Sequence, residues 1–161
     1  MKFQVKGMDF SRAGQAATKI KKALQLAGMD PATMRKAIII AYEAEMNIVI
    51  HAYHGTLTAN ITPHKVEIIA EDEGPGIPDI PLAMQEGYST APPHIREMGF
   101  GAGMGLPNIK KSADELDIQS EVNKGTRLWA AIFNNVNIQQ NRFGEDAVLS
   151  ARDSAASNRV H

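Results

Sequence analysis

The sequence contains no cysteine among its 161 residues. This absence excludes disulfide bonds, thiolate zinc sites and a thiol nucleophile together. No window of 18 apolar residues occurs either, and the opening MKFQVKGMDF lacks an apolar stretch of signal-peptide length. Such runs are needed for a membrane-spanning helix and for a secretory signal respectively. We therefore expect a cytoplasmic protein that does not enter a membrane.

An excess of charge of either sign is also missing. The 17 Lys and Arg residues are balanced by 18 Asp and Glu, giving a net charge of -1. Without a strong overall field, the chain has no electrostatic preference for nucleic acid. A hydrophobic fraction of 43% and a charged fraction of 22% are typical of a soluble globular domain. The expected ligands are therefore small molecules or other proteins.

Hydrophobic periodicity predicts one folded domain followed by a polar tail. The predicted helices are 11–27, 31–54, a short one at 82–86, and 106–113. The predicted strands are 1–6, 56–62, 65–71, 116–121 and 126–133. This order predicts an α+β sandwich with helices on one face of a mixed, mostly antiparallel sheet. We expect the domain to cover 1–136 and the tail to cover 137–161, with at most one helical turn near 145–151.

Two further segments are predicted to lack regular structure. Residues 71–81 contain two glycines and three prolines, which break helices and strands. Residues 88–100 contain two consecutive prolines and no clear period, which predicts a mobile loop.

The long helix at 31–54 carries three polar side chains on one stripe. Glu43, Asn47 and His51 are spaced i, i+4 and i+8, so they are stacked on one helical face. Most other positions are apolar, which predicts a buried helix. Polar groups on a buried face are costly unless they are paired or used. The stripe therefore indicates either a site or, with about equal weight, a face exposed to water.

A carboxylate follows the predicted strand at 65–71. Asp72 is followed by Glu73 and then by Gly74, Pro75 and Gly76. A carboxylate in a partly apolar cleft can accept a hydrogen bond from an exocyclic amino group such as that of adenine. The glycines would let the backbone approach a flat ring closely. The alternative, a tight turn bearing surface acids, is favoured if this motif is taken alone.

Glycines alternate in the segment GFGAGMGLPNIKK, directly before a predicted helix. Backbone without side chains presents consecutive N–H groups, and the start of a helix adds partial positive charge. The segment matches neither GxGxxG nor GxxxxGK[ST]. We favour an anion-binding role over that of a simple linker.

Together, the motifs YEAEMN, DEGPGIPD, GFGAGMGLPNIKK and NKGT resemble those of the GHKL ATPase superfamily in order and approximate spacing. The resemblance covers about 37–133. Within the superfamily, the chain is most similar to the small serine kinases that regulate sigma factors through STAS-domain partners. These are the anti-sigma-factor kinases and the stressosome switch kinases.

The resemblance implies a Bergerat ATP-binding fold that uses ATP and Mg²⁺. It implies that Glu43 is the general base, Asn47 the magnesium ligand and Asp72 the adenine anchor. The remaining implied nucleotide-binding residues are Gly74 and Gly76 in the turn beneath the base, the adjacent Ile77, Gly101, Gly103, Met104, Gly105 and Leu106 beside the phosphates, and Thr126, which closes the adenine pocket. The segment 88–100 would be the ATP lid.

The expected function is that of a serine/threonine kinase that phosphorylates a STAS-like partner in bacterial sigma-factor or stress signalling. The alternative is a non-catalytic, ATP-dependent module that binds an anti-sigma partner. An arginine that some anti-sigma kinases place before the second glycine box is absent, with Gly101 or Ala102 there instead. This departure favours the switch kinases. Related kinases often dimerise, so a homodimer is a further expectation, although no stripe identifies an interface.

Four other polar side chains receive structural interpretations. Glu45 lies off the stripe, so we expect it at the surface or facing a partner. His51 is expected to make a structural hydrogen bond, rather than to act in catalysis. His54 could pair with it around a metal, but a histidine at a helix end is more often solvated. Arg96 in the lid is expected to be solvated, the alternatives being contact with phosphate or with a partner carboxylate.

Overall fold

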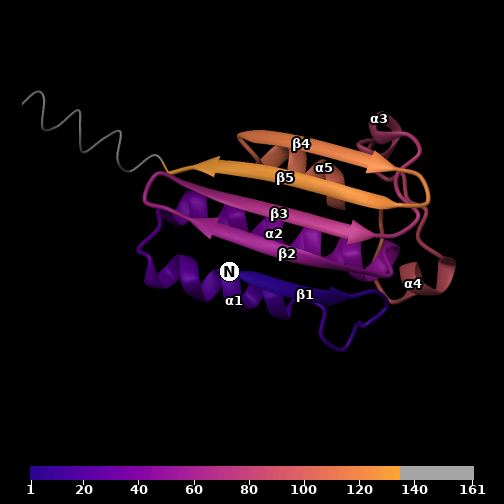
Figure 1. Ribbon diagram of the computed structural model, residues 1–161, viewed down its shortest axis with the longest axis horizontal. Helices are drawn as coiled ribbons and strands as arrows, with labels where there is room; N and C mark the ends of the chain where they lie inside the picture. Colours follow the sequence, from indigo (N-terminus) through magenta and orange to yellow (C-terminus); the bar gives the residue numbers. More distant parts are fainter. Residues whose placement is uncertain (135–161) are drawn as a thin grey trace, which may run out of the picture.

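The computed structural model describes residues 1–134, which form a single five-stranded sheet. In Figure 1 the strands run in the order β1-β2-β3-β5-β4, and every neighbouring pair is antiparallel. Their bounds are β1 (Lys2–Lys6), β2 (His54–Ile61), β3 (Lys65–Glu73), β4 (Glu115–Glu121) and β5 (Gly125–Phe133). The described strands thus contain no parallel pair of the kind that a mixed sheet would include.

The three longer helices cover one face of the sheet, as the sequence predicts. These are α1 (Gln15–Leu26), α2 (Pro31–His51) and α5 (Gly105–Ser112), all behind the strands in Figure 1. Two short helices, α3 (Ile80–Ala83) and α4 (Pro93–Glu97), lie beyond one end of the sheet. The expected α+β sandwich is therefore confirmed. The expected tail and its helical turn near 145–151 lie outside the described residues.

The hydrophobic core lies between α2 and the sheet. Ile40 and Ile48 of α2 pack in one cluster with Leu57 and Ile68 of the sheet, and all four are almost fully buried. Along β3 burial alternates, with Val66, Ile68 and Ala70 inward. Because side chains two apart share a strand face, Asp72 continues this inward series. The core therefore directs a carboxylate to the helix-covered side at the end of β3.

Helix α2 begins where the sequence predicts but ends earlier. Its N-cap, Asp30, accepts a hydrogen bond from Thr33 N at 3.2 Å, and proline fills the first turn. The helix ends at His51 because Ala52 is already extended, so the predicted end at 54 was wrong. Gly55 lies within β2, where a Cβ would lie 2.6 Å from Glu71 O of β3.

Other boundaries also differ from the prediction. Helix α1 starts at Gln15 rather than at 11, because Gly14 has φ +89° and cannot continue a right-handed helix. The segment predicted to be irregular contributes residues 71–73 to β3, and the next short helix is 80–83 instead of 82–86. The predicted loop at 88–100 contains α4.

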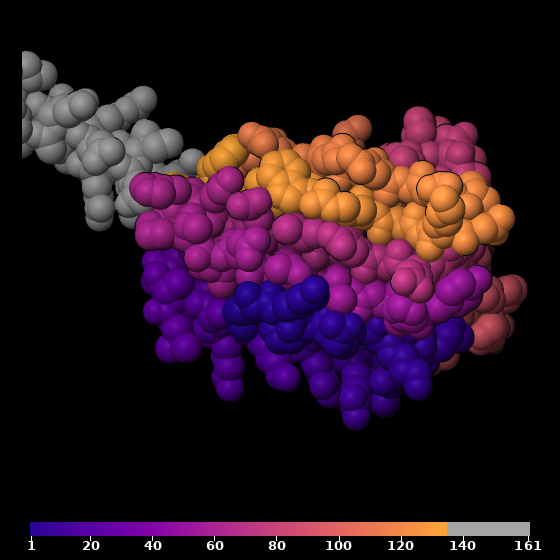
Figure 2. Space-filling model, viewed as in Figure 1, coloured from indigo at the N-terminus to yellow at the C-terminus, as the bar shows by residue number. Residues whose placement is uncertain are grey.

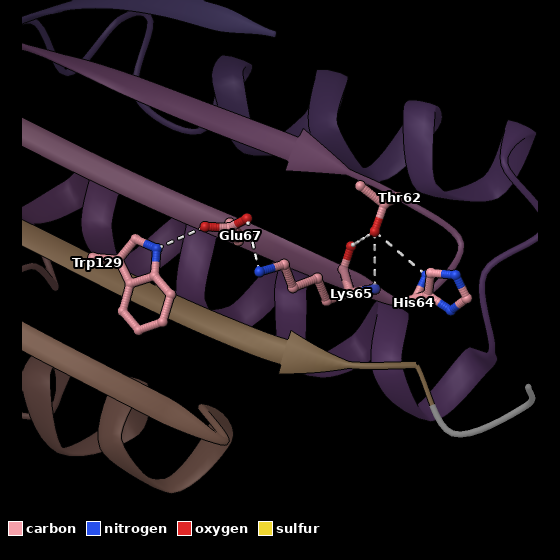
Figure 3. A network of polar contacts seen from close by, with 5 residues as sticks. All are labelled: Thr62, His64, Lys65, Glu67 and Trp129. Atoms are coloured by element: carbon pink, nitrogen blue, oxygen red, sulfur yellow. Dashed lines mark hydrogen bonds and ion pairs between the residues drawn. The ribbon is translucent and has the colours of Figure 1, made fainter. Parts of the chain in front are cut away.

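The opposite face of the sheet is not covered by helices of the described chain and forms the surface in Figure 2. It carries a polar network on β3 and β5, drawn in Figure 3. Trp129 Nε1 donates to Glu67 Oε2 at 2.8 Å, and Lys65 Nζ lies 3.3 Å from Glu67 Oε1. The bond from Trp129 lowers the pKa of Glu67 below its ordinary value; desolvation opposes this, and Lys65 adds a smaller lowering. The only tryptophan of the chain is thus fixed in the sheet and can report on unfolding.

Candidate functional site

A cavity of about 910 Å³ opens between α2, the end of β3, β5 and the glycine-rich segment before α5. The sequence-predicted site residues that line it are Glu43, Asn47, Asp72, Gly76, Ile77, Gly101, Gly103, Met104, Gly105, Leu106 and Thr126. Gly74 is buried and does not line the cavity. The fold therefore gathers four motifs that are far apart in the sequence around one space. The roles assigned to these residues stay predictions.

One end of the cavity is formed by α2 and the start of α5. A Cβ at Gly105 would lie 3.1 Å from Glu43 Oε2 and 3.3 Å from Asn47 Oδ1. The two oxygens therefore face the same small space, which the side chain of any residue other than glycine at position 105 would occupy. Asn108, one turn into α5, donates a hydrogen bond from Nδ2 to Glu43 Oε1 at 3.3 Å.

The third residue of the predicted stripe, His51, also lines the cavity. Within residues 1–134 its side chain makes no hydrogen bond, so the expected structural hydrogen bond is not found in the described part of the chain. Desolvation by surrounding protein lowers the pKa of His51, although the residue as a whole remains exposed. His54 lies on β2 instead, exposed, with Nε2 3.2 Å from Glu73 Oε2.

The other end of the cavity is built around Asp72. Its carboxylate is half-buried beside the apolar side chains of Ala70 and Leu128, and Oδ1 accepts a hydrogen bond from Thr126 N at 3.2 Å. Burial raises the pKa of Asp72, and the hydrogen bond from Thr126 opposes that rise. This end therefore offers a carboxylate oxygen within a partly apolar wall.

The turn after Asp72 is held in place by β4 and by the turn that joins β4 to β5. Gly74 N donates to Lys124 O at 3.1 Å, which fixes the backbone of this turn. Gly76 has φ +72°, and a Cβ there would lie 2.4 Å from Glu121 O. Ile77 N donates to Ser120 Oγ at 2.7 Å. At position 76, where the turn comes closest to β4, there is therefore room only for glycine.

Ser120 connects this turn to Thr126. The Ser120 hydroxyl lies 2.8 Å from Thr126 Oγ1 and also donates to Gly125 O at 3.1 Å. Neither Ser120 nor Asn108 was among the predicted site residues. Ser120 lies in a strand pattern with no distinguishing signal, whereas Asn108 lies within the quoted segment GLPNIKK, three residues after Gly105. Its bond to Glu43 spans 65 residues of sequence, so no local spacing predicts it.

The glycine-rich segment adopts backbone conformations that require glycine. Gly101 and Gly103 have φ of +70° and +80°. A Cβ at Gly103 would lie 2.5 Å from the carbonyl carbon of Gly87, whose amide in turn donates to Gly103 O at 2.9 Å. Helix α5 begins at Gly105 without a side-chain cap. Its first amides therefore remain available to an anion in the cavity.

The segment predicted as a lid packs beside these glycines. Arg96 is exposed, as expected of a solvated charge, and its Nη2 also donates to Ser89 O of the same segment at 2.6 Å. The ring of Phe100 lies 5.2 Å from that of Phe10, which precedes α1. The segment is thereby connected to the N-terminal part of the chain.

Glu45 is the clearest correction at the side-chain level. It is 3% exposed and accepts hydrogen bonds from three amides at the start of α1, namely Gly14 N at 3.0 Å, Ala16 N at 3.2 Å and Ala17 N at 2.9 Å. A carboxylate is favourable at a helix N-terminus because it meets both unpaired N–H groups and the positive end of the dipole. The expectation of a surface or partner-facing residue was wrong, since α1 covers this side of α2.

The cavity can be tested for its fit to magnesium. The described residues hold no group of three or more His, Cys, Asp or Glu side chains placed to bind a metal ion. Magnesium does not require such a group, because it often keeps several waters and takes one or two protein oxygens together with substrate phosphates. The amide oxygen of Asn47, beside the space left by Gly105, fits that mode.

Comparisons with known proteins find relatives over the part of the chain that surrounds the cavity. The family described as "Histidine kinase-, DNA gyrase B-, and HSP90-like ATPase" matches residues 34–135. A protein of Bacillus subtilis (strain 168) named serine/threonine-protein kinase RsbT is 34% identical over 126 residues, which cover 76% of this chain and 86% of that protein. An anti-sigma F factor of Geobacillus stearothermophilus is 31% identical over 123 residues, covering 71% and 81% respectively.

No helix within residues 1–134 is long and apolar enough to cross a membrane. The matched region contains most of α2, the turn after β3, the glycine-rich segment and the β4–β5 hairpin, which together surround the cavity. The region that matches the family model therefore includes the residues that line the cavity. The chain belongs to the histidine kinase-, DNA gyrase B- and HSP90-like ATPase family.

Proposed function

We propose that this chain is an ATP-dependent serine/threonine kinase that phosphorylates a STAS-domain partner in bacterial sigma-factor or stress signalling. The observation that carries the proposal is the pair of oxygens from Glu43 and Asn47, which converge beside Gly105 at one end of the cavity. The names of the two relatives, a serine/threonine-protein kinase and an anti-sigma F factor, support it. Residues 1–136 would form the kinase domain, acting in the cytoplasm.

In this proposal ATP spans the cavity. The adenine amino group would donate to Asp72, with Thr126 beside it and the turn of Gly74, Gly76 and Ile77 under the ring. The phosphates would lie against the segment from Gly101 to Leu106, where amides at the start of α5 carry no side-chain cap. Asn47 would supply one magnesium ligand, and waters and phosphate oxygens would supply the others.

The carboxylate of Glu43 would then act as the general base. Its Oε2 would accept the proton of a partner Ser or Thr hydroxyl while the oxygen of that hydroxyl forms a bond to the γ-phosphorus. The bond between the γ-phosphorus and the bridging oxygen breaks, and ADP leaves with the electron pair. Magnesium, when bound, neutralises charge on the phosphate oxygens. A module that only bound its partner would not need a base beside the metal ligand.

Phosphoryl transfer tests the proposal directly. Tagged protein, a STAS-domain protein from the same organism and γ-labelled Mg-ATP are combined, and acid-stable label on Ser or Thr is measured. We expect labelling by the native protein, and at least about 100-fold slower labelling by Glu43→Gln with ATP affinity retained. Glu115→Gln, an exposed acid on β4, is the matched control. ATP-dependent retention of the partner without labelling would instead favour the non-catalytic binding module.

A further inference from the structure

We infer that Asn108 is a positioning residue for the Glu43 carboxylate, fixing which of its oxygens faces the reacting hydroxyl. This inference deepens the proposed kinase function and rests on it. The hydrogen bond from Asn108 Nδ2 to Glu43 Oε1 at 3.3 Å is the only side-chain bond to Glu43 among the described residues. It joins α5 to α2 across 65 residues of sequence.

The two oxygens of Glu43 have different surroundings. Oε2 points to the Gly105 position, where an added Cβ would lie 3.1 Å away, and Asn47 Oδ1 would lie 3.3 Å from the same point. Oε1 is occupied by Asn108. A carboxylate can rotate and exchange its oxygens unless one of them is held by a donor. The amide of Asn108 therefore leaves Oε2 to accept a proton on the side of Asn47.

Asn108 also forms part of a second, more open space. A groove between α2 and α5 is lined by Glu43 and Asn108 together with Ile38, Ile39, Tyr42, Lys111 and Ser112. Glu43 lines both this groove and the main cavity, whereas Asn108 lines the groove. The bond thus spans the boundary between the two spaces. Without it, the carboxylate would be free to turn away from the cavity and into the groove.

The position of Asn108 also couples the base to the glycine-rich segment. Asn108 N donates to Met104 O at 2.9 Å, so its backbone is attached to the residue that caps α5. If the glycine-rich segment shifted on binding phosphate, the first turn of α5 would transmit that shift to Glu43. A small misplacement of a catalytic group is costly, because a displacement of about 1 Å can slow a reaction about 100-fold.

The test compares three substitutions at one position. Asn108→Ala removes the donor, Asn108→Ser keeps a shorter donor, and Asn108→Asp keeps the shape but presents a second acceptor to Glu43. We expect kcat for partner phosphorylation to fall by about 10-fold for Ala and about 100-fold for Asp, with Ser closest to the native protein. The affinity for ATP is expected to stay within about 2-fold, because Asn108 does not line the cavity.

The order of the three variants separates positioning from simple packing. A residue that only fills space would tolerate the isosteric Asp better than Ala, so that order would overturn the inference. Lys110→Ala, an exposed residue on the same helix, controls for damage to α5. Trp129 fluorescence during unfolding verifies that each variant is folded; if Asp fails this test, a kcat for Ala equal to the native value still overturns the inference.

Failure of the inference is distinguishable from failure of the proposed function. An active native protein whose Asn108 variants all keep the native kcat would remove Asn108 from its role and leave the kinase proposal standing. A native protein that binds ATP and partner but never transfers the phosphoryl group would overturn both.

Discussion

The surroundings of Asp72 disfavour the ionised form of its carboxylate. Burial raises its pKa, and the amide of Thr126 offsets this only in part. When the pKa of an acid is higher in the folded state than in the unfolded chain, protonation stabilises the fold. That contribution is fully present at pH values below the ordinary pKa of 3.8 and is lost as the pH rises through the raised pKa. At neutral pH the ionised Asp72 therefore lowers the stability of the ligand-free protein.

We expect Asp72→Asn to raise the midpoint of thermal unfolding in the absence of nucleotide at pH 7, because it removes this charge. The gain should shrink as the pH falls toward 3.8, where Asp72 itself becomes neutral. Unfolding of both proteins, followed by Trp129 fluorescence at several pH values, provides the measurement. A gain that stays constant with pH would mean that the charge is not its cause.

Replacing Asp72 is expected to stabilise the ligand-free fold but to weaken the binding of ATP. If Asp72 accepts a hydrogen bond from adenine, Asp72→Ala should weaken ATP binding by about 1 to 3 kcal/mol, because the amino group of the base is left unpaired. Calorimetric titration with ATP, and with GTP for comparison, measures this. Guanine presents a carbonyl where adenine presents an amino group, so the native protein should prefer ATP. Unchanged ATP affinity in the variant would remove the adenine assignment.

At the scale of whole elements, Glu45 joins α2 to the start of α1. Three amides donate to this one buried carboxylate, and Gly14, the first of them, has a left-handed conformation that any other residue would resist. Helix α1 therefore depends for its N-terminal cap on a residue 28 to 31 positions later. The helix that carries the candidate base also fixes where α1 begins.

We expect Glu45→Ala to lower the free energy of unfolding by at least about 2 kcal/mol, because three buried or part-buried amides lose their acceptor. Glu45→Gln, which keeps one acceptor oxygen, should cost less. Urea unfolding monitored by Trp129 fluorescence measures both variants. Glu115→Ala, an exposed acid without such contacts, should stay within about 0.5 kcal/mol of the native protein. An equally small loss at Glu45 would contradict the capping role.

The glycine-rich segment allows a matched comparison of two glycines. Gly99 and Gly103 both have positive φ, but a Cβ at Gly99 meets nothing within 4 Å, whereas at Gly103 it meets the backbone of Gly87 at 2.5 Å. Gly99→Ala should cost only about 1 to 2 kcal/mol from its left-handed conformation. Gly103→Ala should cost more and also weaken ATP binding, since the segment must move. Equal effects on stability and affinity would show that the clash is absorbed without displacing the site.

At the scale of the whole molecule, the cavity brings together α2, the sheet and α5, so a ligand bound there should stabilise the fold as a unit. At a free concentration 100 times its Kd, Mg-ATP should add about 2.7 kcal/mol to the free energy of unfolding. Thermal unfolding with and without Mg-ATP measures this shift. Adding EDTA should reduce it if Asn47 holds magnesium together with the phosphates. A shift that EDTA leaves intact would argue against a role for the metal in binding.

Much of the fold and of the candidate site could be predicted because the relevant signals are local. The cap at Asp30, the alternation in β3 and the glycines from 99 to 105 each depend on neighbouring residues. The end of α2 was predicted too late because its cause lies elsewhere: residues 54 and 55 pair with Glu73 and Asp72 of β3. Tertiary pairing outweighed a helical pattern that ran on through His54.

The sequence by itself determined the family motifs and the order of the elements. These follow from residue type and spacing, which require no knowledge of distant neighbours. Only the tertiary structure decided that Glu45 caps α1, that His51 makes no side-chain hydrogen bond in the described chain, and that Asn108 holds Glu43. Each of these depends on which helix packs against α2. That packing is set by burial of apolar faces over long sequence separations, for which a single sequence has no local signal.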